Sequence, residues 1–173
     1  MVPVVVAVLV LVNVLGRDGG GDASGPVADV SGATSSPRGD LPPVRVDTPA
    51  ITPAADLACP ALMGQLPLEL AGAASRQVDS DSPYAYAWDD PPVVLVCGAD
   101  PPAGYVVGAA TIVISGVEWF VDTSDPEVVV WTTVDRDVPV QVRVPATTDS
   151  ASVTALCPLI ATAIPYAQPT PAG

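Results

Sequence analysis

The residues with the most chemical potential lie in one short stretch of the chain, SPYAYAWDDPPVVLVCG, which covers residues 82–98. A carboxyl group beside an aromatic wall can acquire the raised pKa that a general acid needs. Aromatic rings in a loop can also stack on a sugar or a peptide. We therefore assign a candidate binding loop to the aromatic residues and carboxylates of this stretch, which are Tyr84, Tyr86, Trp88, Asp89 and Asp90.

Each of these groups also has an ordinary structural interpretation. Adjacent aspartates before a double proline are typical of a turn, and aromatic residues in a loop often cover the end of a sheet. The stretch supplies no second group at a defined distance, so we assign no catalytic residue. Asp79-x-Asp81 begins like a calcium loop, but Tyr84 stands where that loop needs glycine, so only a weak, irregular calcium site stays open and we assign no metal ligand and no cofactor.

The composition of the chain excludes several classes of function. The chain contains no histidine and no lysine, which removes histidine-activated nucleophiles, histidine metal sites, Schiff bases and the lysine of a phosphate-binding loop. The formal net charge is −13, from 19 acidic residues and six basic ones. A surface that binds nucleic acid or anionic lipid needs clustered basic side chains, so we expect no nucleic-acid partner.

The organisation along the chain suggests an anchor, a tether and one domain. Residues 1–15 are almost entirely apolar but too few to span a bilayer, and no basic residue precedes them, so we interpret them as the remainder of a signal peptide or membrane anchor whose start is missing. The alternative is a buried strand or helix of a cytosolic core. Residues 16–40 are rich in Gly, Ser and Asp and are predicted to be a disordered linker. A single domain is predicted over 41–166, with a proline-rich tail at 167–173.

The periodicity of the domain predicts two helices. Thr52 as N-cap and Pro53 at the first position open a helix that runs to about Leu66, although Pro60 should delay or kink it. Asp149 or Ser150 caps a closing helix that ends before Pro165.

The strands are predicted from apolar runs between turn residues. Val44–Val46 is a possible edge strand, and the uninterrupted run from Pro92 to Cys97 suits a central strand that is buried on both faces. Further strands are predicted at 111–115, 117–122, 128–134 and 138–144, and the last of these alternates valine with polar residues, so one of its faces should be wet. The predicted fold class is α+β, with an antiparallel sheet of four to five strands and two helices packed on one face.

Three cysteines in a chain with an export-like leader predict one disulfide and one leftover thiol. Cys59 on the inner face of the first helix and Cys97 at the end of the central strand are our preferred pair, since a helix and a strand end can approach to the required distance. The rival pair is Cys59 with Cys157, across the two helices. In the preferred arrangement Cys157 is a buried, unreactive thiol.

Several of these motifs together resemble a known family. The run from Trp88 to Gly98, the sequence ISGVEWF at 114–120 and WTTVDR at 131–136 are similar to an actinobacterial family of unknown function, DUF3515. The resemblance covers about residues 41–165 and implies an exported or membrane-associated protein with the Cys59–Cys97 disulfide. It implies no activity. The chain departs from the family pattern at Asp89, where glycine is usual, and in having Cys157.

From these observations we expect an exported or membrane-tethered domain of the cell envelope that acts without catalysis, by contact with an envelope protein or a wall component. Its contact with the membrane should be through the N-terminal segment only. The alternative is an envelope enzyme, or a module for a small ligand or glycan, that uses the loop from Tyr84 to Asp90.

Overall fold

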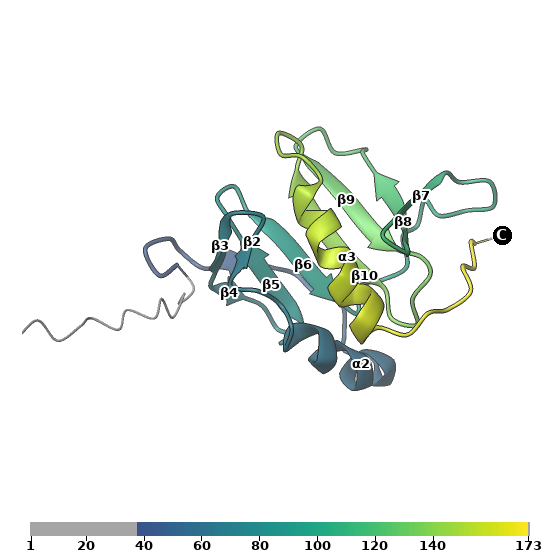
Figure 1. Cartoon of the computed structure of the whole chain (residues 1–173), viewed down its shortest axis with the longest axis horizontal. Helices are drawn as coiled ribbons and strands as arrows, with labels where there is room; N and C mark the ends of the chain where they lie inside the picture. The colour runs from purple at the N-terminus through teal and green to yellow at the C-terminus, as the bar shows by residue number, and fades with distance from the viewer. Residues whose placement is uncertain (1–37, 173) are drawn as a thin grey trace, which may run out of the picture. The chain divides into compact units, whose positions relative to one another are not determined.

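We describe residues 38–172 of the 173-residue chain from a computed structural model. An antiparallel sheet of eight strands forms the centre of this part (Figure 1). The order across the sheet is β2 (Glu69–Leu70), β3 (Ala73–Arg76), β5 (Ala85–Trp88), β6 (Val93–Cys97), β10 (Val140–Pro145), β9 (Val128–Thr133), β8 (Val117–Asp122) and β7 (Thr111–Ile114).

Two helices cover one face of the sheet. They are α2 (Pro53–Met63) and α3 (Ala151–Ala163), and both contribute to the same buried core as the inward-facing residues of β6, β8 and β10 (Figure 1). The Thr52 hydroxyl oxygen accepts a hydrogen bond from the Ala55 amide at 3.1 Å, so the predicted N-cap is confirmed. The helix passes through Pro60 and ends at Met63, earlier than predicted.

The opposite face is covered by a pair of short strands and by a loop segment. Strands β1 (Val44–Arg45) and β4 (Val78–Asp79) form a separate parallel pair. Val44 and Val46 pack with Val78 against Val94 and Val96 of β6. Over the half formed by β8 and β9, the segment 100–104 lies beside the sheet, with Gly104 against the ring of Phe120.

All five residues of β6 are buried, so the prediction of a central, doubly buried strand is confirmed. Val93, Leu95 and Cys97 face the helices, while Val94 and Val96 face the β1–β4 pair. This division follows from the period of two along a strand. An uninterrupted apolar run is therefore what the position requires.

The predicted number of strands was too low. The class, a mixed α+β fold with an antiparallel sheet, is confirmed, but the sheet has eight strands rather than four or five. The four strands that the prediction missed, β2 to β5, are each two to four residues long. Because Ala85–Trp88 is one of them, Tyr86 and Trp88 of the candidate loop lie on a strand, and Tyr84 lies in the turn just before it.

Residues near both ends of the described range form backbone contacts with the rest of the fold. Arg38, which was assigned to the linker, forms a parallel bridge with Arg76 of β3. In the predicted tail, the Ala172 amide donates to the Tyr105 carbonyl at 3.0 Å. Among residues 38–172 there is no helix whose length and hydropathy suit a membrane span. The predicted anchor lies outside the described residues, as does nearly all of the predicted linker.

Candidate functional site

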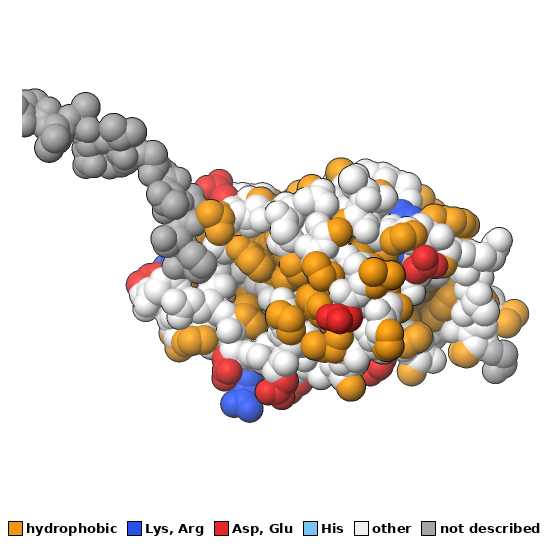
Figure 2. All heavy atoms as spheres, turned by 90° about the horizontal axis from the view of Figure 1, so that it is seen from below, with side chains coloured by type: hydrophobic (Ala, Val, Ile, Leu, Met, Phe, Trp, Pro, Cys, Tyr) orange, Lys and Arg blue, Asp and Glu red, His pale blue; other side chains and the backbone are white. Residues whose placement is uncertain are grey.

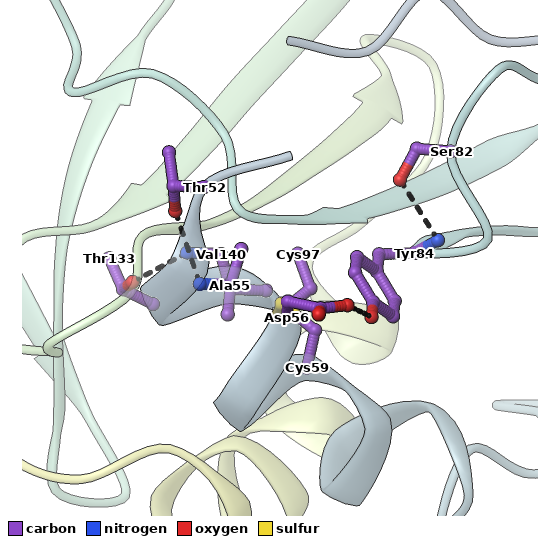
Figure 3. The surroundings of a disulfide bond; sticks show 9 residues. All are labelled: Thr52, Ala55, Asp56, Cys59, Ser82, Tyr84, Cys97, Thr133 and Val140. Atoms are coloured by element: carbon purple, nitrogen blue, oxygen red, sulfur yellow. Dashed lines mark hydrogen bonds between the residues drawn. A yellow bond between two sulfur atoms is a disulfide. The ribbon is translucent and has the colours of Figure 1, made fainter. Parts of the chain in front are cut away.

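A disulfide joins the first helix to the central strand beside the first candidate site. Cys59 in α2 and Cys97 at the end of β6 are joined, with their Cα atoms 5.8 Å apart (Figure 3). Cys157 is a buried free thiol in α3 whose sulfur donates to the Val153 carbonyl at 3.2 Å. Burial raises the pKa of this thiol. The preferred cysteine pairing and the leftover thiol are therefore confirmed.

Tyr84 lies beside the disulfide, where it ties β5 to α2. Its hydroxyl donates to an Asp56 carboxylate oxygen at 2.6 Å (Figure 3). The hydrogen bond to Asp56 raises the pKa of Tyr84 above its usual value, with smaller contributions from burial and from the Asp56 charge. The Ser82 hydroxyl in turn accepts from the Tyr84 amide at 3.2 Å (Figure 3). Tyr84 therefore has a structural role in joining strand and helix.

Trp88 and Tyr86 point to the helix-covered face of β5. Trp88 is completely buried, and its indole nitrogen donates to the Pro67 carbonyl at 2.8 Å. Tyr86 is half-buried, and its ring centroid lies 4.6 Å from that of Trp88 at an interplanar angle of 42°. Of the three aromatic residues proposed for binding, only Tyr86 offers part of its ring to solvent.

The two aspartates of the candidate segment point in different directions. Asp89 is exposed, has a positive φ of 65° and accepts from the Asp90 amide at 2.8 Å. Asp90 pairs at 3.1 Å with the guanidinium of Arg76, whose side chain is only 6% exposed. Arg76 also donates to the carbonyls of Asp89 and Pro42. The two carboxylates thus serve a turn and an ion pair at the end of β5.

A second candidate site, which the sequence analysis did not identify, lies on the face of the sheet opposite the helices. A hollow of about 540 Å³ runs between the β1 segment and the ends of β9 and β10. Its lining consists largely of prolines and small apolar residues, with a few charged ones: Val44, Arg45, Pro91, Pro92, Val94, Pro126, Glu127, Val128, Arg143, Pro145, Ala146 and Thr147.

A neighbouring hollow of about 370 Å³ shares Arg143 as a lining residue. It is bounded by the segment 100–104 and by face residues of β8, β9 and β10, which are Asp122, Val130, Thr132 and Gln141. We call the two hollows together the Arg143 groove. Arg143 stands where they meet, with Val94 on one neighbouring strand and Val130 on the other.

The guanidinium of Arg143 is the charged group at the centre of this groove. Its Nε donates to Gln141 Oε1 at 2.8 Å. Arg38, Arg45, Arg76 and Arg136 each lie within ion-pair distance of a carboxylate. Among the five arginines of residues 38–172, Arg143 alone has no such partner. Its two terminal nitrogens therefore remain available in a half-buried position.

The carboxylates around the groove do not neutralise Arg143. Asp122 accepts from the Ser124 amide at 2.9 Å, and this hydrogen bond holds the pKa of Asp122 below its usual value. Glu127 is exposed and forms no ion pair among the described residues. The only sequence signal for the groove was an arginine in the middle of the alternating strand, on its wet face.

Among residues 38–172, no cluster of three or more Cys, Asp or Glu side chains is arranged to hold a metal ion.

A third surface feature is the weakly charged outer side of α2. Leu57 is 86% exposed, and Ile51 just before the helix is 44% exposed. Figure 2, which views the molecule from the α2 side, shows hydrophobic side chains gathered over much of this face with few charged groups among them. Asp56 is the only charged residue of α2, and α3 has none.

Comparison with known proteins identifies the family and goes no further. No curated protein and no solved structure matches the chain. Residues 1–169 match the family described as Protein of unknown function (DUF3515). With that match over nearly its whole length, the chain belongs to the DUF3515 family.

Proposed function

We propose that this chain is an extracytoplasmic domain of the cell envelope, held at the membrane by its N-terminal segment, that acts without catalysis by binding another protein or a wall component. The binding surface in this proposal is the Arg143 groove. The observation that carries it is the half-buried guanidinium of Arg143, which lines the hollow of about 540 Å³ and forms no ion pair with any carboxylate of residues 38–172. An arginine that has no carboxylate partner within the described part of a strongly acidic protein is suited to a ligand that supplies a negative charge.

The disulfide supports the extracytoplasmic location. Disulfides persist in oxidising compartments and are rare where cellular thiols keep cysteines reduced. The Cys59–Cys97 bond joins α2 to the central strand, and both sulfurs belong to buried residues, so it is part of the core rather than a surface feature. The N-terminal apolar residues and the linker account for the tether in this proposal.

The alternative function, catalysis or glycan binding at the Tyr84–Asp90 segment, has weaker support. It requires aromatic faces that a ligand can reach, whereas Trp88 is fully buried and Tyr84 is 7% exposed. Asp90 is paired with Arg76, and Asp89 is the one freely exposed carboxylate of the segment. These observations favour the groove as the binding surface.

The location is tested by the redox state of the native protein. When cells are lysed directly into denaturant that contains an alkylating reagent and no reductant, the reagent should modify Cys157 alone. Alkylation after reduction should modify all three cysteines. Native protein recovered from the cytosol with Cys59 and Cys97 reduced would contradict the extracytoplasmic proposal.

The binding role is tested by photo-crosslinking of the full chain in its native cells. A benzophenone amino acid at the exposed Thr147 of the groove should yield a discrete adduct, and the additional change Arg143→Glu should abolish that adduct. The matched control places the same amino acid at Thr154, which is exposed on α3. Equal adducts from Thr147 and Thr154, or an adduct that survives Arg143→Glu, would contradict binding at the groove.

A further inference from the structure

We infer that the Arg143 groove binds an extended peptide segment of another protein, with an aspartate or glutamate carboxylate held by Arg143 and small apolar side chains on either side of it. This inference rests on the proposed function and specifies the ligand of the same site. Its elements are the orientation of the guanidinium, the charges along the groove and the shape of its walls.

The guanidinium is oriented for a carboxylate. Because Nε donates to Gln141, the two terminal nitrogens of the guanidinium remain as a pair of donors for a ligand. Such a pair matches the two oxygens of a carboxylate. Val94 and Val130 flank Arg143 on the adjacent strands. Apolar neighbours lower the local polarity, so an ion pair formed here is stronger than one on an open surface.

The charges along the groove favour a ligand with one negative charge. The charged residues that line the larger hollow are Arg45, Glu127 and Arg143. Arg45 lies 3.8 Å from an Asp79 oxygen, so Arg143 is the cation there that has no carboxylate partner among the described residues. The smaller hollow is bordered by Asp100 and Asp122. A second negative charge on the ligand, next to the first, would be repelled by these carboxylates. The whole domain is strongly acidic, so a polyanion such as nucleic acid or an anionic lipid surface would be repelled.

The walls of the groove favour an extended chain of amino acids. Gln141, Arg143 and Pro145 of β10 line the groove, and the five residues 141–145 span about 16 Å, as do five residues of an extended ligand. The walls contain Pro91, Pro92 and Pro126 around the larger hollow, and Pro101 and Pro102 around the smaller one. Proline side chains lose almost no conformational entropy when a ligand covers them. Apolar contact with such walls therefore costs little side-chain entropy, which suits Ala, Val and Pro side chains on the ligand.

The test uses two pools of capped pentapeptides and the full chain labelled with nitrogen-15. The first pool has aspartate at its centre with Ala, Val or Pro at the flanking positions, and the second is identical except for a central asparagine. In two-dimensional NMR spectra, the aspartate pool should shift the Arg143 Nε–H signal and the amide signals of Val94 and Val130. The asparagine pool should bind at least tenfold more weakly, because it lacks the charge that strengthens the hydrogen bonds.

Variants assign the effect to Arg143. Arg143→Gln should remove the difference between the two pools, while Arg143→Lys should retain part of it. The control is Arg38→Gln, which removes the same charge from a residue that pairs with Asp40 outside the groove, and it should leave binding unchanged. Amide dispersion and melting temperature check that each variant is folded. The comparison of pools on the parent protein does not depend on any variant.

Three results would overturn the inference: equal binding of the two pools, signal shifts centred outside the groove, or binding of acetate alone as tight as that of the aspartate pool. If the peptides fail while the Arg143-dependent crosslink from Thr147 persists, the ligand class is wrong and the proposed function stands. If both fail, the groove has no binding role.

Discussion

Gly98 lies directly against Ala55: a Cβ atom added to Gly98 would stand 2.8 Å from the Cβ of Ala55 and 3.9 Å from the sulfur of Cys59. Gly98 also has a φ of 84°, in the left-handed region that favours glycine. It follows β6 directly, at the point where α2 crosses the end of that strand. The absence of a side chain at Gly98 is thus what lets helix and strand approach closely enough for the disulfide.

We predict that Gly98→Ala destabilises the fold by about 3 kcal/mol, as the sum of the left-handed backbone cost and the overpacking of the core. The matched control is Gly108→Ala, since Gly108 has a φ of 88° but no atom within 4 Å of an added Cβ. That variant should lose only the backbone term, about 1–2 kcal/mol. Urea denaturation of both variants measures the difference. Equal losses would show that the contact with Ala55 does not contribute to the free energy of unfolding.

Replacing both Cys59 and Cys97 by alanine should lower the free energy of unfolding by about 4 kcal/mol, the loop-closure value for a bond between residues separated by 38 positions. The parent protein in reductant should lose a similar amount. Cys157→Ala is the control: it should keep the disulfide and its sensitivity to reductant. A double variant as stable as the oxidised parent would show that core packing alone holds α2 on the sheet.

The parts of the fold that the sequence predicted correctly are those with strong local signals. Thr52 followed by Pro53 is a local helix-start signal, and five apolar residues in a row at 93–97, bounded by turn residues, suit a strand with both faces covered. The missed strands lack such signals. Ala73–Arg76 contains only alanine, serine and arginine, which are not typical strand residues. Its place in the sheet depends on pairing with β5 and on the hydrogen bonds that the buried Arg76 side chain donates.

The candidate site, too, could be predicted from the sequence only where local signals are strong. Aromatic residues alternate with alanine from Tyr84 to Trp88, and this period of two was a strand signal that the interpretation as a loop overlooked. The Arg143 groove could not be predicted, because its walls come from segments far apart in the sequence, such as Val44–Arg45 and Pro126–Glu127. An arginine on a wet strand face becomes a candidate only when these walls are known.

Trp88→Ala should destabilise the domain by about 4 kcal/mol, since it removes a fully buried indole and leaves the Pro67 carbonyl without its donor. Asp89→Asn and Asp90→Asn should cost about 1 kcal/mol or less, because the first residue is exposed and Arg76 keeps two carbonyl acceptors when the second is changed. Urea denaturation provides the values. Loss of a bound glycan or of activity in folded Asp89→Asn protein would instead support the alternative function.

The final prediction concerns the alkaline stability that Tyr84 provides. Its hydrogen bond to Asp56 holds the pKa of Tyr84 above the value of about 10 that the unfolded chain has. The folded protein therefore binds this proton more tightly than the unfolded protein does. The stabilisation is complete below pH 10 and is lost as the pH rises through the folded pKa. Above pH 10, the parent protein should become progressively less stable.

Tyr84→Phe should have a lower melting temperature than the parent at pH 7, because the hydrogen bond is gone, but its stability should fall less steeply above pH 10. The background for both proteins is Cys157→Ala, which prevents thiolate attack on the disulfide at high pH. Tyr166→Phe is the matched control, since Tyr166 is 64% exposed, and its profile should follow that of the parent. Parallel profiles for the parent and Tyr84→Phe would mean that the bond between Tyr84 and Asp56 does not couple protonation to folding.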